Sequence, residues 1–127
     1  MSPKALLKLV TVNTAPERAK RVVGRLTAAL ADRYTIIHTA NCETIEQVRP
    51  TVREIQPDLL FCASMWTLEQ ARDIQQIAIE EQPSVKTHAI PTGLHIERGP
   101  DGVVQYLLER VPLLIDGSVQ GNDPERA

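Results

Sequence analysis

The sequence predicts one α/β domain in which a doubly wound, mainly parallel sheet of four or five strands lies between two layers of helices. Short apolar, β-branched runs alternate with stretches whose apolar residues recur every three or four positions, which is typical of β-α-β units. The chain has 127 residues, the length of one domain. Hydrophobic residues make up 43% and charged residues 24%, a globular composition that excludes a disordered or collagen-like chain.

The first strand is predicted at residues 5–12, an almost continuously apolar run of the kind found in strands buried on both faces. The next segment has the signals of a helix start. Thr14 is expected to cap this helix, Pro16 to lie in its first turn and Glu17 to complete a capping box. The apolar stripe that follows predicts a helix to about residue 31.

The second strand is predicted at residues 34–39, where β-branched residues cluster. Apolar residues then recur at helical spacing from Ile45 to Ile55. Pro50 lies inside this pattern and is expected to kink or break the helix. A third buried strand is predicted at residues 58–63.

Thr67 and Gln70 have the spacing of a second capping box and predict the start of another helix. This helix is expected to end before Pro83. The fourth strand is predicted at residues 85–90, which are again mostly apolar or β-branched.

The end of the domain has two alternative predictions. In the first, a helix of about ten residues begins at Val103 and leads to a parallel fifth strand at residues 111–115. In the second, residues 94–98 form an antiparallel strand beside the fourth strand, and the helix is the last element. In both, the domain covers residues 1–115, and the polar residues 116–127 form a disordered tail.

A binding rim is predicted where the strands end, because doubly wound sheets bind ligands at the carboxyl ends of their strands. The residues predicted to form this rim are Asn13, Thr14, Cys42, Trp66 and Thr92. Trp66 has two interpretations, a lid over the core or an anchor for a partner. No glycine-rich phosphate-binding motif is present, so a dinucleotide site and a P-loop are excluded.

The thiols and imidazoles of the chain predict no catalytic or metal site. Cys42 and Cys62 are expected at the ends of different strands, ~10 Å apart by strand spacing, which is too far for a disulfide. Cys62 lies in an apolar strand and is expected to be a small buried hydrophobe. The three histidines lack the spacing of metal ligands, and these are His38, His88 and His95. No metal and no cofactor are expected.

Basic residues are concentrated near the start of the chain. Residues 1–33 carry seven basic and two acidic side chains, whereas the remainder carries seven basic and fourteen acidic ones. Arg18, Arg21 and Arg25 fall along one side of the first predicted helix. This row is either a solvated helix face or a docking surface for an acidic partner. Nucleic acid is not expected, because no aromatic residues are interleaved with the arginines.

Residues 34–63 resemble the middle of a response-regulator receiver domain. The motifs are Ala-Asn-Cys-Glu-Thr-Ile after the second strand and Pro-Asp-Leu-Leu-Phe-Cys-Ala at the third. The order of strands and helices matches too, and the resemblance covers residues 5 to about 92. It implies a flavodoxin-like fold and a signalling role.

The residues that carry receiver chemistry are replaced in this chain. The resemblance places the acidic Mg²⁺-binding pair at Asn13 and Thr14 and the phospho-acceptor aspartate at Ala63. Thr92 is a candidate for the switch hydroxyl, while the lysine after the fifth strand has no match. An alanine cannot accept a phosphoryl group, and two neutral residues cannot hold Mg²⁺ without other carboxylates. The resemblance therefore implies a degenerate receiver, or pseudo-receiver.

The sequence thus favours a non-catalytic regulatory module that acts through protein partners. The alternative is a small-ligand-binding domain or an enzyme that uses the polar rim residues and Cys62. A cytoplasmic location is expected, because the chain has only two cysteines and no apolar run long enough for a signal or a membrane span. No contact with a membrane is expected.

A homodimer is predicted from the number of helices. If the domain ends in a strand at residues 111–115, no closing helix covers one face of the sheet, and residues such as Leu59 and Phe61 would be exposed. Two-fold pairing is the commonest way to bury such a face. If the helix with Leu107 instead folds back over this face, the need for a partner disappears.

Overall fold

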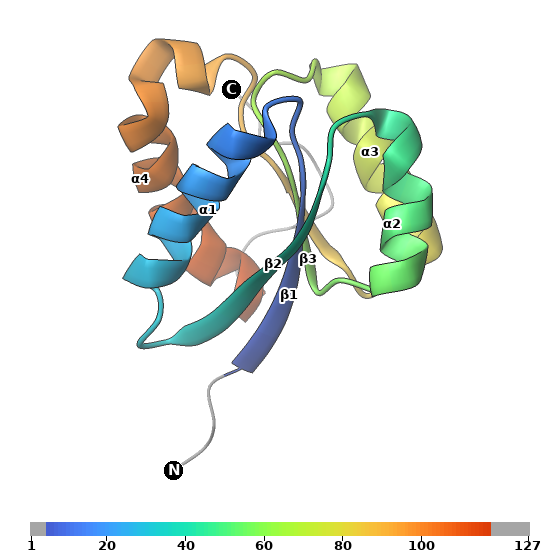
Figure 1. Ribbon diagram of the computed structural model, residues 1–127, viewed down its shortest axis with the longest axis horizontal. Coiled ribbons are helices and arrows are strands. Elements are labelled where there is room, and N and C mark those ends of the chain that lie inside the picture. The colour runs from blue at the N-terminus through green and yellow to red at the C-terminus, as the bar shows by residue number, and fades with distance from the viewer. Residues whose placement is uncertain (1–4, 118–127) are drawn as a thin grey trace.

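Four parallel strands form a single sheet in the order β2-β1-β3-β4 in the computed structural model, which describes residues 5–117. Helices α1 and α4 cover one face of this sheet, and α2 and α3 cover the other (Figure 1). The predicted doubly wound, three-layer α/β fold is therefore confirmed, with four strands. The elements are β1 (Ala5–Val12), α1 (Pro16–Ala29), β2 (Tyr34–Cys42), the 3-10 helix η1 (Ile45–Gln47), α2 (Val48–Ile55), β3 (Leu59–Cys62), α3 (Leu68–Glu81), β4 (Lys86–Ala89) and α4 (Leu94–Asp116).

The sheet divides the core into two apolar layers, because alternate side chains of a strand point to opposite faces. Leu9 of β1 and Phe61 of β3 pack toward α1 and α4. Val10 and Cys62 pack toward α2 and α3. These four side chains are almost completely buried, which is why the two central strands read as continuous apolar runs.

The N-cap of the first helix lies one residue after the predicted one, and the helix begins at Pro16. Its N-cap is Ala15, and Thr14 is exposed and makes no capping hydrogen bond. The side-chain oxygen of Asn13 instead accepts a hydrogen bond from the Ala15 N–H at 2.7 Å. The predicted capping box at Thr14 is wrong because the preceding asparagine closes the turn.

The two later helical regions lie where the sequence predicts them. The Ile45–Ile55 pattern forms η1 followed directly by α2, and the backbone at the junction, Gln47 and Val48, is helical. Pro50 lies in the first turn of α2, where a proline is tolerated, so the kink or break expected at Pro50 is not seen. The capping box of α3 is confirmed. The Gln70 N–H donates to the Thr67 hydroxyl at 3.1 Å, and the Thr67 N–H donates to the Gln70 side chain at 2.9 Å.

The last part of the domain differs from both sequence predictions. Residues 94–98 and 111–115 are helical, and both belong to α4. The apolar run at 111–115 continues the helical stripe that contains Leu107 and Leu114, so it fits a helix as well as a strand. The helix is kinked at Gly99, whose φ of 69° and ψ of −177° suit glycine, and Pro100 starts the next turn.

Because α4 packs on the sheet, the face expected to be bare is covered. Leu59 and Phe61 are only 1% and 2% exposed. The bare sheet face from which a homodimer was predicted is therefore absent from the described residues, 5–117. The domain boundary expected at residue 115 falls inside α4, and residues 118–127 of the predicted tail lie outside the described residues. None of the helices within residues 5–117 is long and apolar enough to cross a membrane.

Candidate functional site

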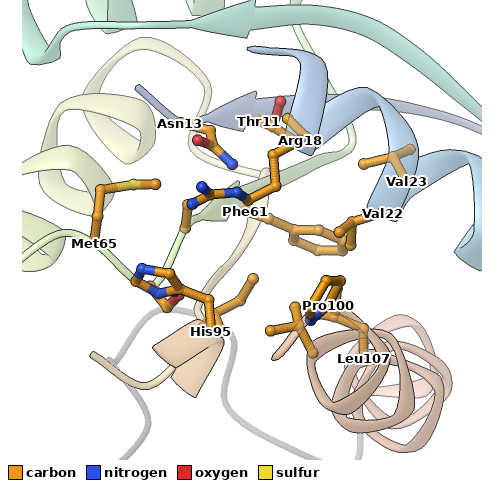
Figure 2. A pocket seen from close by; sticks show the side chains of 15 residues that line it. Thr11, Asn13, Arg18, Val22, Val23, Phe61, Met65, His95, Pro100 and Leu107 are labelled. Atoms are coloured by element: carbon orange, nitrogen blue, oxygen red, sulfur yellow. Dashed lines mark hydrogen bonds between the residues drawn. The ribbon is translucent and has the colours of Figure 1, made fainter. Parts of the chain in front are cut away.

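A cavity of about 210 Å³ opens at the carboxyl edge of the sheet, between α1, β3 and α4 (Figure 2). Its apolar wall comes from the facing sides of the two helices and from Phe61 of β3. The polar residues that line it are Thr11, Asn13, Arg18, Ser64 and His95. None of the aspartates and glutamates within residues 5–117 lines this cavity.

Arg18 supplies the positive charge of the cavity. It lies in the first turn of α1, and its side chain extends into the space that Asn13 and His95 also line (Figure 2). Within residues 5–117, no hydrogen bond or ion pair neutralises its guanidinium. The cavity therefore has an available bidentate donor for an anion.

Asn13 is held in place by a chain of hydrogen bonds across the ends of β1 and β2. The Thr11 hydroxyl donates to the Asn41 side-chain oxygen at 2.7 Å, and the Asn41 amide donates to the Asn13 carbonyl oxygen at 3.0 Å. The Asn13 side-chain oxygen is occupied by the Ala15 N–H. Figure 2 shows the amide nitrogen of Asn13 directed toward the cavity, where it is a second donor.

His38 ends this chain on the β2 side. Its Nε2 lies 2.8 Å from the Thr11 hydroxyl oxygen. Because the single hydroxyl proton of Thr11 goes to Asn41, the imidazole must be the donor at Nε2. Burial lowers the pKa of His38, so the neutral imidazole is favoured.

Ser64 and His95 form the other polar side of the cavity. The Ser64 Oγ lies 2.5 Å from Nδ1 of His95, and Ser64 is buried. Two further hydrogen bonds join the same loops, from the Gly93 N–H to the Ser64 carbonyl at 2.9 Å and from the Thr92 hydroxyl to the Trp66 carbonyl at 2.7 Å. The loop after β3 is thus fastened to the start of α4.

The Ser64–His95 pair does not have the arrangement of a hydrolase triad. In a triad, the serine contacts one ring nitrogen and a carboxylate orients the histidine from the other. Here the serine occupies Nδ1, and within the described part of the chain no carboxylate contacts His95. No group of three or more metal-ligating side chains occurs among residues 5–117 either.

The structure separates the five predicted rim residues. Of these, only Asn13 lines the cavity. Thr14 is exposed beside it, and Thr92 is exposed and joins two loops. Cys42 and Trp66 belong to the core under α2 and α3, so their prediction as accessible rim residues is wrong.

Of the two interpretations of Trp66, the structure favours a lid over the core and not an exposed anchor for a partner. It is 8% exposed, and its indole N–H donates to the Val12 carbonyl at 2.8 Å. The thiols of Cys42 and Cys62 are buried as well, and burial raises the pKa of both. Such thiols are poor nucleophiles, as predicted for Cys62.

The predicted row of arginines has three different environments. Arg18 reaches the cavity, and Arg25 forms an ion pair with Asp101 of α4 at 2.7 Å. Arg21 is exposed on α1. Within this row, Arg25 thus joins α1 to α4, and Arg18 lines the cavity.

Ser64 and His95 are the functional candidates that sequence reasoning missed. Ser64 lies within the loop that was expected at the carboxyl edge, so its position could have been found. The position of His95 could not have been found, because one of the two alternatives for this region made residues 94–98 a strand, whereas they are helical. Only the folding of α4 over the sheet brings His95 to Ser64.

The receiver positions of the sheet lie beside this cavity. Ala63 follows β3 directly, lines the cavity, and donates its N–H to the Val12 carbonyl at 3.0 Å. Asn13 and Thr14 follow β1. All three of these residues at the ends of β1 and β3 have neutral side chains.

Comparison with known proteins agrees with this architecture. No family model and no curated protein matches the sequence. Among solved structures, the chain is similar to the signal receiver domain of NarL from Mycobacterium tuberculosis, with a TM-score of 0.56. The match covers 87% of this chain and 98% of that chain at 10% sequence identity. The chain therefore has the fold of a response-regulator receiver domain, as its sequence resemblance implied.

Proposed function

We propose that the chain is a receiver-like regulatory module that takes no phosphoryl group and acts through contacts with a protein partner. The observation that carries this proposal is Ala63 at the carboxyl end of β3, where the receiver resemblance places the acceptor aspartate. A methyl group can neither form nor stabilise an acyl phosphate. Asn13 and Thr14 lack the carboxylates that Mg²⁺ prefers as ligands.

The proposed partner surface is the exposed part of α1 that carries Arg18 and Arg21. Both side chains are exposed, whereas Arg25 is engaged with Asp101. Two guanidinium groups on one helix, neither of them paired with a residue within 5–117, suit an acidic partner. A module of this kind acts in the cytoplasm. The homodimer predicted from the sequence depended on a bare sheet face, and α4 covers that face, so we propose no pairing of two copies through it.

Incubation with acetyl phosphate and Mg²⁺, followed by intact-mass spectrometry, tests the absence of phosphorylation. We expect no phosphoryl adduct, because Ala63 replaces the acceptor. A receiver domain that retains its aspartate serves as the positive control. A stable adduct that is lost on treatment with hydroxylamine would mean that another carboxylate accepts the group, and the proposal would be wrong.

The cavity favours a second candidate, a module whose signal is a bound small molecule. A concave, mostly apolar site with a few convergent polar groups is typical of ligand sites, and this one lies at the expected edge of the sheet. A thermal-shift screen with metabolites would test it, because a ligand that binds only the folded state raises the melting temperature. If no ligand in the screen shifts the melting temperature, this second candidate is wrong, and the module that acts through protein contacts is the one proposal that stands.

A further inference from the structure

We propose that the cavity binds a small organic carboxylate, with its carboxylate group at Arg18 and a compact apolar group between α1, β3 and α4. This inference rests on the ligand-binding candidate above and names the chemistry of its ligand. It goes beyond the receiver fold, in which the same edge of the sheet handles a phosphoryl group.

The charge of the site selects an anion. Among residues 5–117, Arg18 is the only arginine, lysine, aspartate or glutamate that lines the cavity, and no described residue forms an ion pair with it. Elsewhere on α1, Arg25 is neutralised by Asp101, so the free guanidinium at the cavity contrasts with a paired one on the same helix. A planar guanidinium matches a carboxylate with two parallel hydrogen bonds.

Neutral donors around Arg18 make the site suitable for a carboxylate. The Asn13 amide nitrogen is directed into the cavity (Figure 2). Across from it, the Ser64–His95 pair shares one proton between Oγ and Nδ1 and keeps the second ring nitrogen of His95 outside that bond. These donors come from the loop after β1, the loop after β3 and α4, so they converge only in the folded protein.

The remainder of the wall requires an apolar ligand body. Val22 of α1, Phe61 of β3 and Leu107 of α4 line the cavity, together with Val103 and Pro100. The volume is about 210 Å³, and an apolar cavity of ~150 Å³ in another protein holds a benzene ring. One ring or a short alkyl chain therefore fits beside the carboxylate. A phosphate ion alone would leave the apolar wall without a partner.

A ligand in this position would bridge the two helices that cover one face of the sheet. It would touch α1 through Arg18 and the start of α4 through His95. The kink at Gly99 lies four residues after His95, so the first part of α4 is a separate helical segment. Binding would hold this segment against α1, and it would also occupy Arg18, which belongs to the proposed partner surface.

Isothermal titration of the full chain with phenylacetate and with hexanoate tests the inference. We expect saturable binding of at least one acid and a higher melting temperature in its presence. Phenylacetamide, which has the same shape without the charge, and acetate, which lacks the apolar group, should each bind at least about tenfold more weakly.

Three variants locate the site. Arg18→Gln should weaken binding of the acid about tenfold or more, because it removes a charged donor. Arg21→Gln removes the same charge from α1 outside the cavity and should change the affinity less than about twofold. Val22→Phe adds bulk to the cavity wall from a half-buried position, and it should abolish binding.

Three outcomes would overturn the inference. These are no saturable binding of either acid, equal weakening by Arg18→Gln and Arg21→Gln, or binding of inorganic phosphate as tight as that of the acids. Failure here is distinct from failure of the receiver-like module. A chain that binds neither acid and also takes no phosphoryl group contradicts only the carboxylate site, whereas a phosphoryl adduct contradicts the proposed module.

Discussion

His88 is a buried imidazole in the middle of the layer between β4 and α4. It is 4% exposed, its Nε2 lies 2.7 Å from the Tyr106 hydroxyl, and its ring stacks on the Tyr106 ring. Burial, with a smaller contribution from the charge of Arg110, lowers the pKa of His88 from 6.5 to about 4. The folded protein therefore keeps this histidine neutral at pH values where the unfolded chain binds a proton.

This difference predicts a loss of stability in mild acid. Between pH 6.5 and about 4 the unfolded state binds more protons at His88, so the free energy of unfolding falls as the pH falls. From pH 7.5 to pH 5 we expect His88 to account for a loss of about 2 kcal/mol. Urea unfolding of the wild type and of His88→Gln at both pH values measures it. An equal loss in both proteins would contradict the assignment to His88.

At the scale of the elements, the kink in α4 depends on one glycine. Gly99 has a backbone conformation that other residues rarely adopt, although open space surrounds the position of a side chain. Gly24 also faces open space, but it lies within the regular helix α1. A side chain at either glycine would meet no other atoms, so the two positions differ only in whether the backbone conformation requires glycine.

Alanine at these two positions should change the stability in opposite directions. Gly99→Ala should lower the free energy of unfolding by about 1–3 kcal/mol, because alanine is strained at this φ and ψ. Gly24→Ala should raise it by about 0.5–1 kcal/mol, because alanine favours the helix. Chemical denaturation of both variants checks this. A Gly99→Ala protein as stable as the wild type would show that α4 does not require its kink.

Helices α2 and α3 are joined by a cluster of ion pairs. Glu81 of α3 accepts hydrogen bonds from Arg49 and Arg53 of α2, and Arg49 also contacts Glu80. The hydrogen bonds from Arg53 and Arg49 lower the pKa of Glu81 from 4.5 to about 2. Since the folded pKa is the lower one, this stabilisation is present above pH 4.5 and is lost as the pH falls toward 2.

Glu81→Gln should therefore destabilise the protein near neutral pH and have a decreasing effect in acid. The difference in unfolding free energy between the two proteins should shrink as the pH falls from about 5 to about 2. Glu80→Gln is the matched control, because Glu80 contacts only one of the two arginines and should show a smaller difference. A difference that stays constant with pH would show that packing, not charge, accounts for the effect of Glu81.

On the scale of the whole molecule, α4 closes the sheet face that would otherwise require a second chain. Val103, Leu107 and Leu114 pack into the same core layer as Leu9 and Phe61. The apolar area that would drive pairing of two copies through this face is therefore already buried within one chain.

We therefore expect the full chain to be a monomer at micromolar concentration. Light scattering should give a mass near 14.1 kDa. A mass of twice this value would restore the predicted homodimer, and its interface would then lie on a surface other than the face under α4. Leu107→Asp, which disrupts the packing of α4, should expose this face and promote association.

Much of the fold was predictable because its signals are local. The alternation of apolar runs and the Thr67–Gln70 capping box each act within a few residues, so the four strands and the first three helical regions were found. The start of α1 was misplaced because the Asn13 side chain accepts the Ala15 N–H and closes the turn, so that Ala15 and not Thr14 is the N-cap. The predictions of a strand at residues 94–98 or 111–115 were wrong, because the apolar residues there suit both a strand and a helix.

The amino-acid sequence alone determined what this protein lacks at its carboxyl edge, because Ala63, Asn13 and Thr14 have no carboxylate in any conformation. It also determined the parallel sheet, because strands buried on both faces need continuous apolar runs. Only the tertiary structure decided that Arg18 and His95 line one cavity. They are far apart along the chain, and the packing of α4 on the sheet, through long-range burial of apolar area, brings them together.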